Sequence, residues 1–220
     1  MCNILRHMPM RFIQGHRRGL SILLASMVLS LLLTDSVSSS SPHPATPNTG
    51  DMVAPVDGPP RYPFTRDASM ACGQWKRNSR DYPYFGAPRD PKPRRHAGVD
   101  LYPPQGEGAP VKAMKAGQVI KVASFYTRAN GEKTYGVLID HLDFTANYAE
   151  LKKPGMKAGQ TVASGEIIGQ VSGTRQLHLE LYEAGTRDWS RWYGEKPAKL
   201  LDPTRAMTEL LYGEGTKARE

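Results

Sequence analysis

Hydrophobic and polar residues alternate in short runs through the second half of the chain. The clearest run is TRQLHLELY at 174–182, where three leucines alternate with Gln176, His178, Glu180 and Tyr182. A period of two is typical of a β-strand that buries one face. Similar runs between glycine- and proline-containing turns predict strands at 110–114, 118–123, 135–141, 145–151, 161–163, 167–172 and 176–183.

Helical periodicity is confined to the C-terminal end, where PTRAMTELLY at 203–212 predicts one short helix with proline at its start. Closely spaced short strands with glycine turns favour an all-β sandwich or barrel. Two turns repeat each other, MKAGQVI at 114–120 and MKAGQTV at 156–162. This repeat favours a sandwich built from two related hairpins.

The N-terminal segment predicts export. Arg11, Arg17 and Arg18 precede the apolar run GLSILLASMVLSLLL at 19–33, which is shorter than the roughly 20 residues needed to span a bilayer. Small residues follow, with Val37 and Ser39 at the positions that precede a cleavage site. We therefore expect a signal peptide at 1–39; the alternative is an uncleaved membrane anchor, the only membrane attachment that the sequence suggests.

Composition divides the remainder of the chain. Residues 40–60 are rich in Ser, Pro, Thr and Gly, which predicts a disordered linker. We expect the folded domain at 61–212 and a flexible tail at 213–220. The sequence gives no indication of an oligomeric state.

The formal net charge of +8 includes four arginines and one aspartate in residues 1–41, so the excess in the domain is mild. It suits an anionic wall polymer or membrane surface, whereas the lack of a long basic run argues against nucleic-acid binding. Of the two cysteines, Cys2 precedes the predicted cleavage site, so we expect Cys72 to be a lone thiol. Two distant cysteines cannot supply a cysteine-based zinc site.

Candidate metal chemistry lies in RRHAGVDLYPP at 94–104. His96, Gly98 and Asp100 are spaced by two, so in an extended chain their side chains point the same way, and Gly98 leaves room between the other two. A surface His–Asp pair is the simpler interpretation of this motif alone. Together with His178, however, the set becomes two imidazoles and one carboxylate, which suits catalytic zinc with a fourth position for water.

These motifs resemble a known family. YFGAPRDPKPRRHAGVDLYPPQGEGAPVKAMKAGQVIKV at 84–122, MKAGQTVASGEIIGQVSGT at 156–174 and LDP at 201–203 are similar, in order and spacing, to the lysostaphin-type (LytM-like) zinc peptidases of bacterial cell walls. The resemblance implies a compact antiparallel β-sandwich of the duplicated-hybrid-motif type with a groove for an extended peptide. It also implies Zn²⁺ bound by His96, Asp100 and His178, with Glu180 as a supporting group beside the ligands.

The same resemblance shows a departure at the two catalytic histidines. The family has a Tyr-x-His-Leu segment where this chain has YAEL, so Glu150 takes that position, and Gln176 takes the first position of the family's His-x-His. His141 matches a structural histidine of the preceding strand. The loop before Gln176 is short, which predicts a lower or more open groove wall on that side.

Two functions remain open from the sequence. The first is an exported zinc metalloendopeptidase of the bacterial periplasm or cell envelope, acting on stem or cross-bridge peptides of peptidoglycan, with Glu150 as general base and Gln176 as a hydrogen-bond donor to the oxyanion. The alternative is a non-catalytic zinc-binding adaptor or regulator of other wall hydrolases. An open three-ligand set favours the enzyme, because structural zinc prefers four protein ligands.

Overall fold

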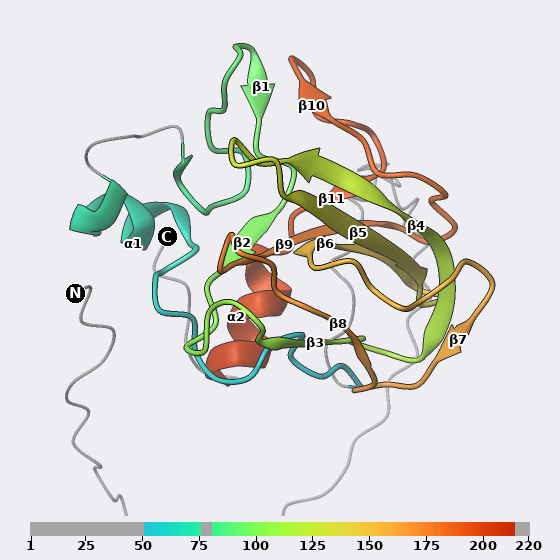
Figure 1. Ribbon diagram of the computed structural model, residues 1–220. Coiled ribbons are helices and arrows are strands. Elements are labelled where there is room, and N and C mark those ends of the chain that lie inside the picture. The colour runs from blue at the N-terminus through green and yellow to red at the C-terminus, as the bar shows by residue number, and fades with distance from the viewer. Residues whose placement is uncertain (1–50, 76–80, 214–220) are drawn as a thin grey trace, which may run out of the picture. The chain divides into compact units, whose positions relative to one another are not determined.

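A computed structural model describes residues 51–75 and 81–213, which belong to one unit of the chain. Its main element is a seven-stranded antiparallel sheet (Figure 1). The order is β11–β9–β6–β5–β4–β7, and β2 pairs with β9 on the same edge as β11. The strands are β2 (Val99–Leu101), β4 (Gly117–Thr127), β5 (Lys133–Asp140), β6 (Phe144–Leu151), β7 (Thr161–Val162), β9 (Leu177–Glu183) and β11 (Leu200–Leu201).

Two small sheets complete the β-structure. Strands β3 (Pro110–Lys112) and β8 (Ile167–Gln170) pair antiparallel, and so do β1 (Arg94–Arg95) and β10 (Trp192–Tyr193). The β3–β8 pair runs beneath the large sheet in the view of Figure 1, whereas the β1–β10 pair extends above it as a narrow ribbon. The prediction of an all-β antiparallel fold is confirmed, and each of the seven predicted strands is present.

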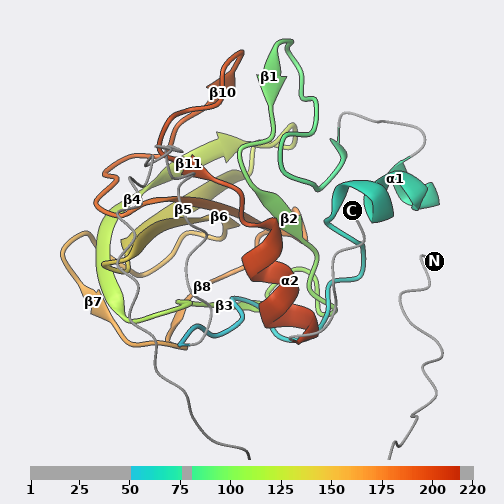
Figure 2. The same cartoon turned by 180° about the vertical axis from the view of Figure 1, so that it is seen from behind.

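Helices are few in the described ranges. Helix α2 (Thr204–Tyr212) follows Pro203 at the predicted position and lies in front of the sheet when the molecule is seen from behind (Figure 2). Its Ala206 and Met207 join the core. The short helix α1 (Arg66–Ala71) and the 3-10 turn η1 (Gly73–Trp75) precede the sheet. None of these helices is long and apolar enough to cross a membrane.

The core follows from the alternation in β9. Leu177, Leu179 and Leu181 are completely buried in the main hydrophobic cluster. Burying one such side chain contributes about 1.5–3 kcal/mol. The polar face of the strand, which begins with His178, is therefore fixed in register with the neighbouring strands, because a slip by one residue would exchange the two faces.

Two expectations about the N-terminal part need correction. Residues 51–60, assigned to the linker from their composition, pack on the domain: Met52 and Val56 are buried in the core, and the amide of Val53 donates to Met114 O at 2.9 Å. Cys72 is disulfide-bonded, so the prediction of a lone thiol is wrong. The predicted signal peptide or anchor at 1–39, the linker up to residue 50 and the tail at 214–220 lie outside the described residues.

Gly98 allows β2 to approach β9. A Cβ atom at this position would lie 2.2 Å from the backbone oxygen of Leu179 and 2.8 Å from its carbonyl carbon, both far inside van der Waals contact. The following residues pair directly, Val99 with Leu179 and Asp100 with His178. Glycine is thus required where the HAGVD segment enters the sheet, for a steric reason that the spacing argument partly anticipated.

Replacing Gly98 by alanine is expected to push β2 away from β9 and to lower the free energy of unfolding by about 3 kcal/mol. Zinc affinity should fall with it, because Asp100 and His178 face each other across this strand pair. Urea denaturation and zinc titration measure the two effects. Gly155→Ala is the matched control, since its Cβ would have no heavy atom within 4 Å; equal effects of the two substitutions would contradict this account.

Candidate metal centre and pocket

Three ligand atoms converge at the strand pair β2–β9. His96 Nε2 lies 3.1 Å from Asp100 Oδ1 and 3.0 Å from His178 Nδ1, and the last two atoms are 2.9 Å apart. All three residues are buried, with 4–6% of their surface exposed. The structure thus brings together the three metal ligands predicted from the sequence.

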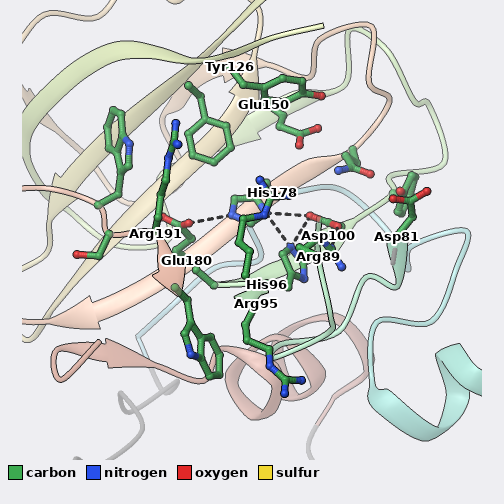
Figure 3. A pocket seen from close by; sticks show the side chains of 18 of the residues that line it. Asp81, Arg89, Arg95, His96, Asp100, Tyr126, Glu150, His178, Glu180 and Arg191 are labelled. Carbon is green, nitrogen blue, oxygen red and sulfur yellow. Dashed lines mark hydrogen bonds and ion pairs between the residues drawn. The ribbon is translucent and has the colours of Figure 1, made fainter. Parts of the chain in front are cut away.

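Each ligand is held by a partner on its other side, and Figure 3 shows two of these partners, Arg89 and Glu180. His96 Nδ1 donates to the backbone oxygen of Tyr84 at 2.9 Å, and His178 Nε2 donates to Glu180 Oε1 at 3.0 Å. The guanidinium of Arg89 donates to Asp100 Oδ2 at 3.1 Å. Partners of this kind fix the tautomer and orientation of metal ligands.

These outer contacts leave three lone pairs facing one another. With a hydrogen on His96 Nδ1 and on His178 Nε2, the opposite ring nitrogens carry no hydrogen, and Asp100 Oδ1 is an acceptor as well. Such an arrangement is unfavourable unless a cation lies between the atoms. Ligand atoms of a tetrahedral zinc site are about 3.3 Å apart for metal–ligand distances of 2.0–2.1 Å, so the donor set and its spacing both fit zinc.

The electrostatics of the three groups agree with a site built for a cation. Burial lowers the pKa of His96 to about 4 and keeps this ring neutral. Burial also acts to lower the pKa of His178, but the hydrogen bonds with Asp100 and Glu180 outweigh it and raise the pKa to about 10. In Asp100 the two histidines outweigh burial and lower the carboxyl pKa. Without metal, a proton on His178 therefore supplies the positive charge.

Glu180 has the supporting place that the sequence predicted. Its Oε1 accepts from His178, and its Oε2 accepts from Asn147 Nδ2 at 2.7 Å and from the Tyr182 hydroxyl at 2.9 Å. The carboxylate is 3% exposed. Both oxygens are engaged, so Glu180 orients His178 and has little freedom for another role.

A pocket of about 550 Å³ opens beside the three ligands. Its wall includes Glu150 and Gln176, and Figure 3 shows Glu150 above His178 and below Tyr126. Two further segments contribute to the wall. Residues 123–133 supply Phe125 and Tyr126, and residues 185–196 supply the stretch from Trp189 to Trp192.

Glu150 is placed by a β-bulge. Regular alternation after Tyr148 would turn Glu150 into the hydrophobic core. Instead, the β5–β6 register shifts between Tyr135 and Val137, and Glu150 adopts φ 66°. The extra residue returns Leu151 to the core and puts Glu150 on the face of His178. A left-handed backbone at a non-glycine residue costs roughly 1–2 kcal/mol, which the surrounding sheet sustains.

The carboxyl of Glu150 is buried, and one of its two oxygens lacks a hydrogen-bond partner in the described part of the chain. It is 7% exposed, and its Oε2 has no hydrogen-bond partner among the described residues. Burial, helped by the charge of Asp100, raises the pKa of Glu150 to about 7, although His178, Thr174 and Gln176 favour the charged form. A carboxyl with a pKa near neutrality can accept and return a proton at physiological pH.

His141 lies away from this pocket. Its Nε2 is 3.0 Å from the Tyr148 hydroxyl, which accepts from the Met114 amide, and its Nδ1 is 3.1 Å from Ala116 O. The ring is buried. These contacts satisfy both nitrogens, as expected for a structural histidine.

Sequence reasoning missed several residues of the wall. Arg89, Tyr102 and Tyr126 line the pocket, and so do Trp75 and Asp81 from the segment before β1. The bulge at Glu150 did leave a signal, because the core residues Tyr148 and Leu151 are three apart where a regular strand would separate them by two. No comparable pattern marks the loop residues.

Comparison with known proteins identifies a family pattern in this region. Residues 94–188 match the model of peptidase family M23. That segment contains the three candidate ligands and both wall residues, Glu150 and Gln176. The part of the chain that forms the site thus carries the sequence pattern of peptidase family M23, which confirms the resemblance at this level. No curated protein matches the sequence.

Several solved structures are similar to the chain. One is a protein assigned to peptidase family M23 from Pseudomonas aeruginosa, with 24% identity over 74% of this chain and 53% of its own, and a TM-score of 0.43. A zinc-containing peptidase from Vibrio cholerae has 25% identity over 51% of this chain and 30% of its own (TM-score 0.36). The catalytic domain of lysostaphin from Staphylococcus simulans has 24% identity over 52% and 80% (TM-score 0.38). The chain spans about half or less of the first two proteins.

The raised pKa of Glu150 predicts a pH-dependent difference in stability. In metal-free protein, the folded state holds the Glu150 proton up to about pH 7, whereas the unfolded chain releases it near 4.5. The contribution of this group is complete below pH 4.5 and is lost as pH rises through 7. Glu150→Gln should therefore unfold like the parent protein at pH 4.5 and be more stable by up to about 3 kcal/mol at pH 8.5.

Urea denaturation of chelator-treated protein at the two pH values measures this difference. Glu132→Gln is a useful control, because Glu132 is a partly exposed carboxylate with a lowered pKa, held by Arg128 and by the amide of Gly173, and the sign of its pH dependence is opposite. An equal effect of Glu150→Gln at pH 4.5 and pH 8.5 would contradict the assignment.

Proposed function

We propose that the protein is an exported zinc metalloendopeptidase of the M23 type that hydrolyses peptidoglycan peptides in the bacterial periplasm or cell envelope. The observation that carries this proposal is the open three-ligand centre beside a buried, incompletely satisfied carboxyl, within the segment that matches the family. A site that only stabilised the fold would have no use for either feature.

His96, Asp100 and His178 would hold the zinc ion, with Arg89 and Glu180 orienting the ligands. When bound, zinc supplies a Lewis acid that polarises a peptide carbonyl and acidifies a water molecule. The walls around the ligands exclude bulk water, which strengthens the interactions of charged groups inside.

Glu150 is the general base in this proposal. Its position above His178, its pKa near 7 and its unpartnered Oε2 suit it to take the proton from the attacking water and return it to the leaving amine. Gln176 supplies an amide N–H donor to the developing oxyanion, a task that requires no titrating group. Glu150 and Gln176 would thus take over the work of the two catalytic histidines that the family resemblance implies.

The alternative is an adaptor that binds zinc and a wall peptide without cleaving it. The observation in its favour is Gln176, because an amide cannot exchange a proton in the way that histidine can. The same experiment separates the two functions, since an adaptor would retain peptide on purified sacculi and produce no new amino termini.

Glu150→Gln is expected to lower cleavage of purified sacculi by about 10²- to 10⁴-fold, because it removes the proton acceptor but preserves shape and a hydrogen-bonding end. Zinc content should remain at one ion per chain. Mass analysis of released fragments and metal analysis measure the two quantities. A chelator should abolish cleavage by the parent protein, and stoichiometric zinc should restore it.

Unchanged cleavage by Glu150→Gln would remove Glu150 as the base. Absence of new termini from the zinc-loaded parent protein would contradict the peptidase function and favour the adaptor.

The double substitution Glu150→His with Gln176→His is expected to raise cleavage of ordinary crosslinked peptides. It places imidazoles at both positions beside an unaltered ligand set, so the site regains two groups that donate hydrogen bonds and exchange protons. Initial rates on defined crosslinked peptides measure the change. A lower rate would show instead that Glu150 and Gln176 are adapted to a different peptide.

A further inference from the structure

The β1–β10 ribbon carries a pair of arginines on its pocket face. Its register pairs Arg94 with Tyr193 and Arg95 with Trp192. Continued by one residue, the same register places Arg191 opposite His96. Since side chains alternate between the faces of a ribbon, Arg94 and Arg191 share the face of the metal ligand His96.

Arg95 and Trp192 belong to the opposite face. Trp192 packs against Phe85 with ring centroids 5.2 Å apart, and the Arg95 guanidinium donates to Gly86 O at 3.4 Å. Figure 3 shows Arg95 turned away from the histidine pair, whereas Arg191 rises beside Glu180. Residues of both faces line the pocket, but Arg95 and Trp192 also attach the ribbon to the loop before it, whereas Arg94 and Arg191 lie on the face of His96.

Arg94 and Arg191 have no acidic partner within 51–75 and 81–213, although both line the pocket. Arg94 lies in β1 and Arg191 directly precedes β10, so two flexible side chains from neighbouring parts of one ribbon border the same pocket and can reach one anion. Of the other basic groups near the pocket, Arg95 is turned away from the histidines and donates to the backbone, and the rest form ion pairs. Arg89 is paired with Asp100, and Lys121 forms an ion pair with Asp188 at 2.7 Å over the ring of Trp189.

The carboxylates that line the pocket do not compensate this pair. Asp100 and Glu180 are bound by the histidines, Glu150 lies above His178, and Asp81 has a partner of its own. A divalent cation at the ligands would add further positive charge. The free charge on this wall is therefore positive, and aromatic neighbours such as Phe125 and Trp189 lower its screening by water.

We propose that Arg94 and Arg191 form a carboxylate-binding subsite that selects peptides with a free carboxylate close to the bond at the metal centre. Guanidinium groups bind carboxylates with two parallel hydrogen bonds, which gives orientation as well as affinity. The subsite deepens the proposed function by naming the substrate class, and it rests on that function for the place of the scissile bond. The carboxylate comes either from the peptide C-terminus or from a side chain.

The test measures peptide binding, so that it does not depend on cleavage. The probes are soluble peptides released from sacculi by a glycan hydrolase, either intact or with all carboxylates converted to methylamides. A synthetic pair of one such peptide, with a C-terminal acid or a C-terminal amide, distinguishes the terminal from the side-chain source. Calorimetry is performed with full-length, zinc-loaded protein carrying Glu150→Gln to prevent turnover.

Intact peptides are expected to bind at least tenfold more tightly than methylamidated peptides. Arg94→Gln and Arg191→Gln should each weaken binding of the intact peptides about tenfold, as expected for a charge-assisted hydrogen bond, and leave binding of the methylamidated peptides unchanged. Arg205→Gln is the control, because Arg205 is an exposed arginine of α2 paired with Glu209. If the synthetic peptide with a C-terminal amide binds as weakly as the methylamidated peptides, the subsite binds the terminal carboxylate. If it binds as tightly as the peptide with a C-terminal acid, the subsite binds a side-chain carboxylate.

Three results would overturn the subsite. Intact and methylamidated peptides could bind with equal affinity, or the arginine variants could lose the same affinity for both kinds of peptide. The third is that intact peptides do not bind. These results are distinguishable from failure of the peptidase function. Cleavage by the parent protein that is independent of both arginines removes the subsite alone. Carboxylate-dependent binding without cleavage by the parent protein removes the peptidase function alone.

Discussion

Three electron-rich atoms, two imidazole nitrogens and one carboxylate oxygen, lie 2.9–3.1 Å apart in the interior of this protein. They are tolerated there only with a cation between them, whether a proton or a metal ion. The rest of the site follows from this constraint. The β2–β9 pairing brings the atoms together, Gly98 allows the approach, and three outer partners hold the ligands so that their lone pairs point inward.

Strand alternation in the same sheet places the residues that stabilise the fold on one face and the residues of the candidate site on the other. In β9 the leucines build the core, and His178 and Glu180 occupy the opposite face. Residues on the pocket face can therefore be exchanged without a change in the core face, provided that the strand register is kept. Glu150 shows how an exception is made: the bulge in β6 inserts one residue, so a side chain that belongs to the core by position enters the pocket instead. Its strained backbone is the local cost of that placement.

Much of this arrangement was predictable because it follows from short-range periodicity. The alternation located seven of the eleven described strands, β3 to β9, the spacing of His96 and Asp100 indicated an extended segment, and TRQLHLELY indicated a two-faced strand. What the sequence could not give was the covering of the polar face. His178 and Glu180 are buried, not solvated, because Phe125 and the loop from Trp189 to Trp192 close over them. The contacts of Phe125 with His178 and Trp189 join segments more than 50 residues apart and leave no local pattern.

Composition was misleading in the N-terminal part for a related reason. Residues 51–60 contain few large apolar side chains, yet Met52 and Val56 fill gaps in a core that other segments provide. A segment need not bury much surface to become ordered when its backbone amides find partners on an existing strand end, as the hydrogen bond from Val53 to Met114 O illustrates. The linker assignment considered the segment alone, whereas its order depends on the domain beside it.

The division between the metal centre and its surroundings bears on how selectivity arises. The ligands, Glu150 and Gln176 all lie within residues 94–188, the segment with the family pattern. The pocket wall also uses residues on either side of that segment, among them Trp75, Asp81 and Arg191. Under the proposed function, a change in these wall residues would alter which peptide fits and leave the ligand geometry untouched, because among the described residues outside that segment only Arg89 and the backbone oxygen of Tyr84 hold a ligand side chain. Arg94 begins that segment and Arg191 follows it, which suits the proposed arginine pair to couple substrate choice to the ligand centre without disturbing it.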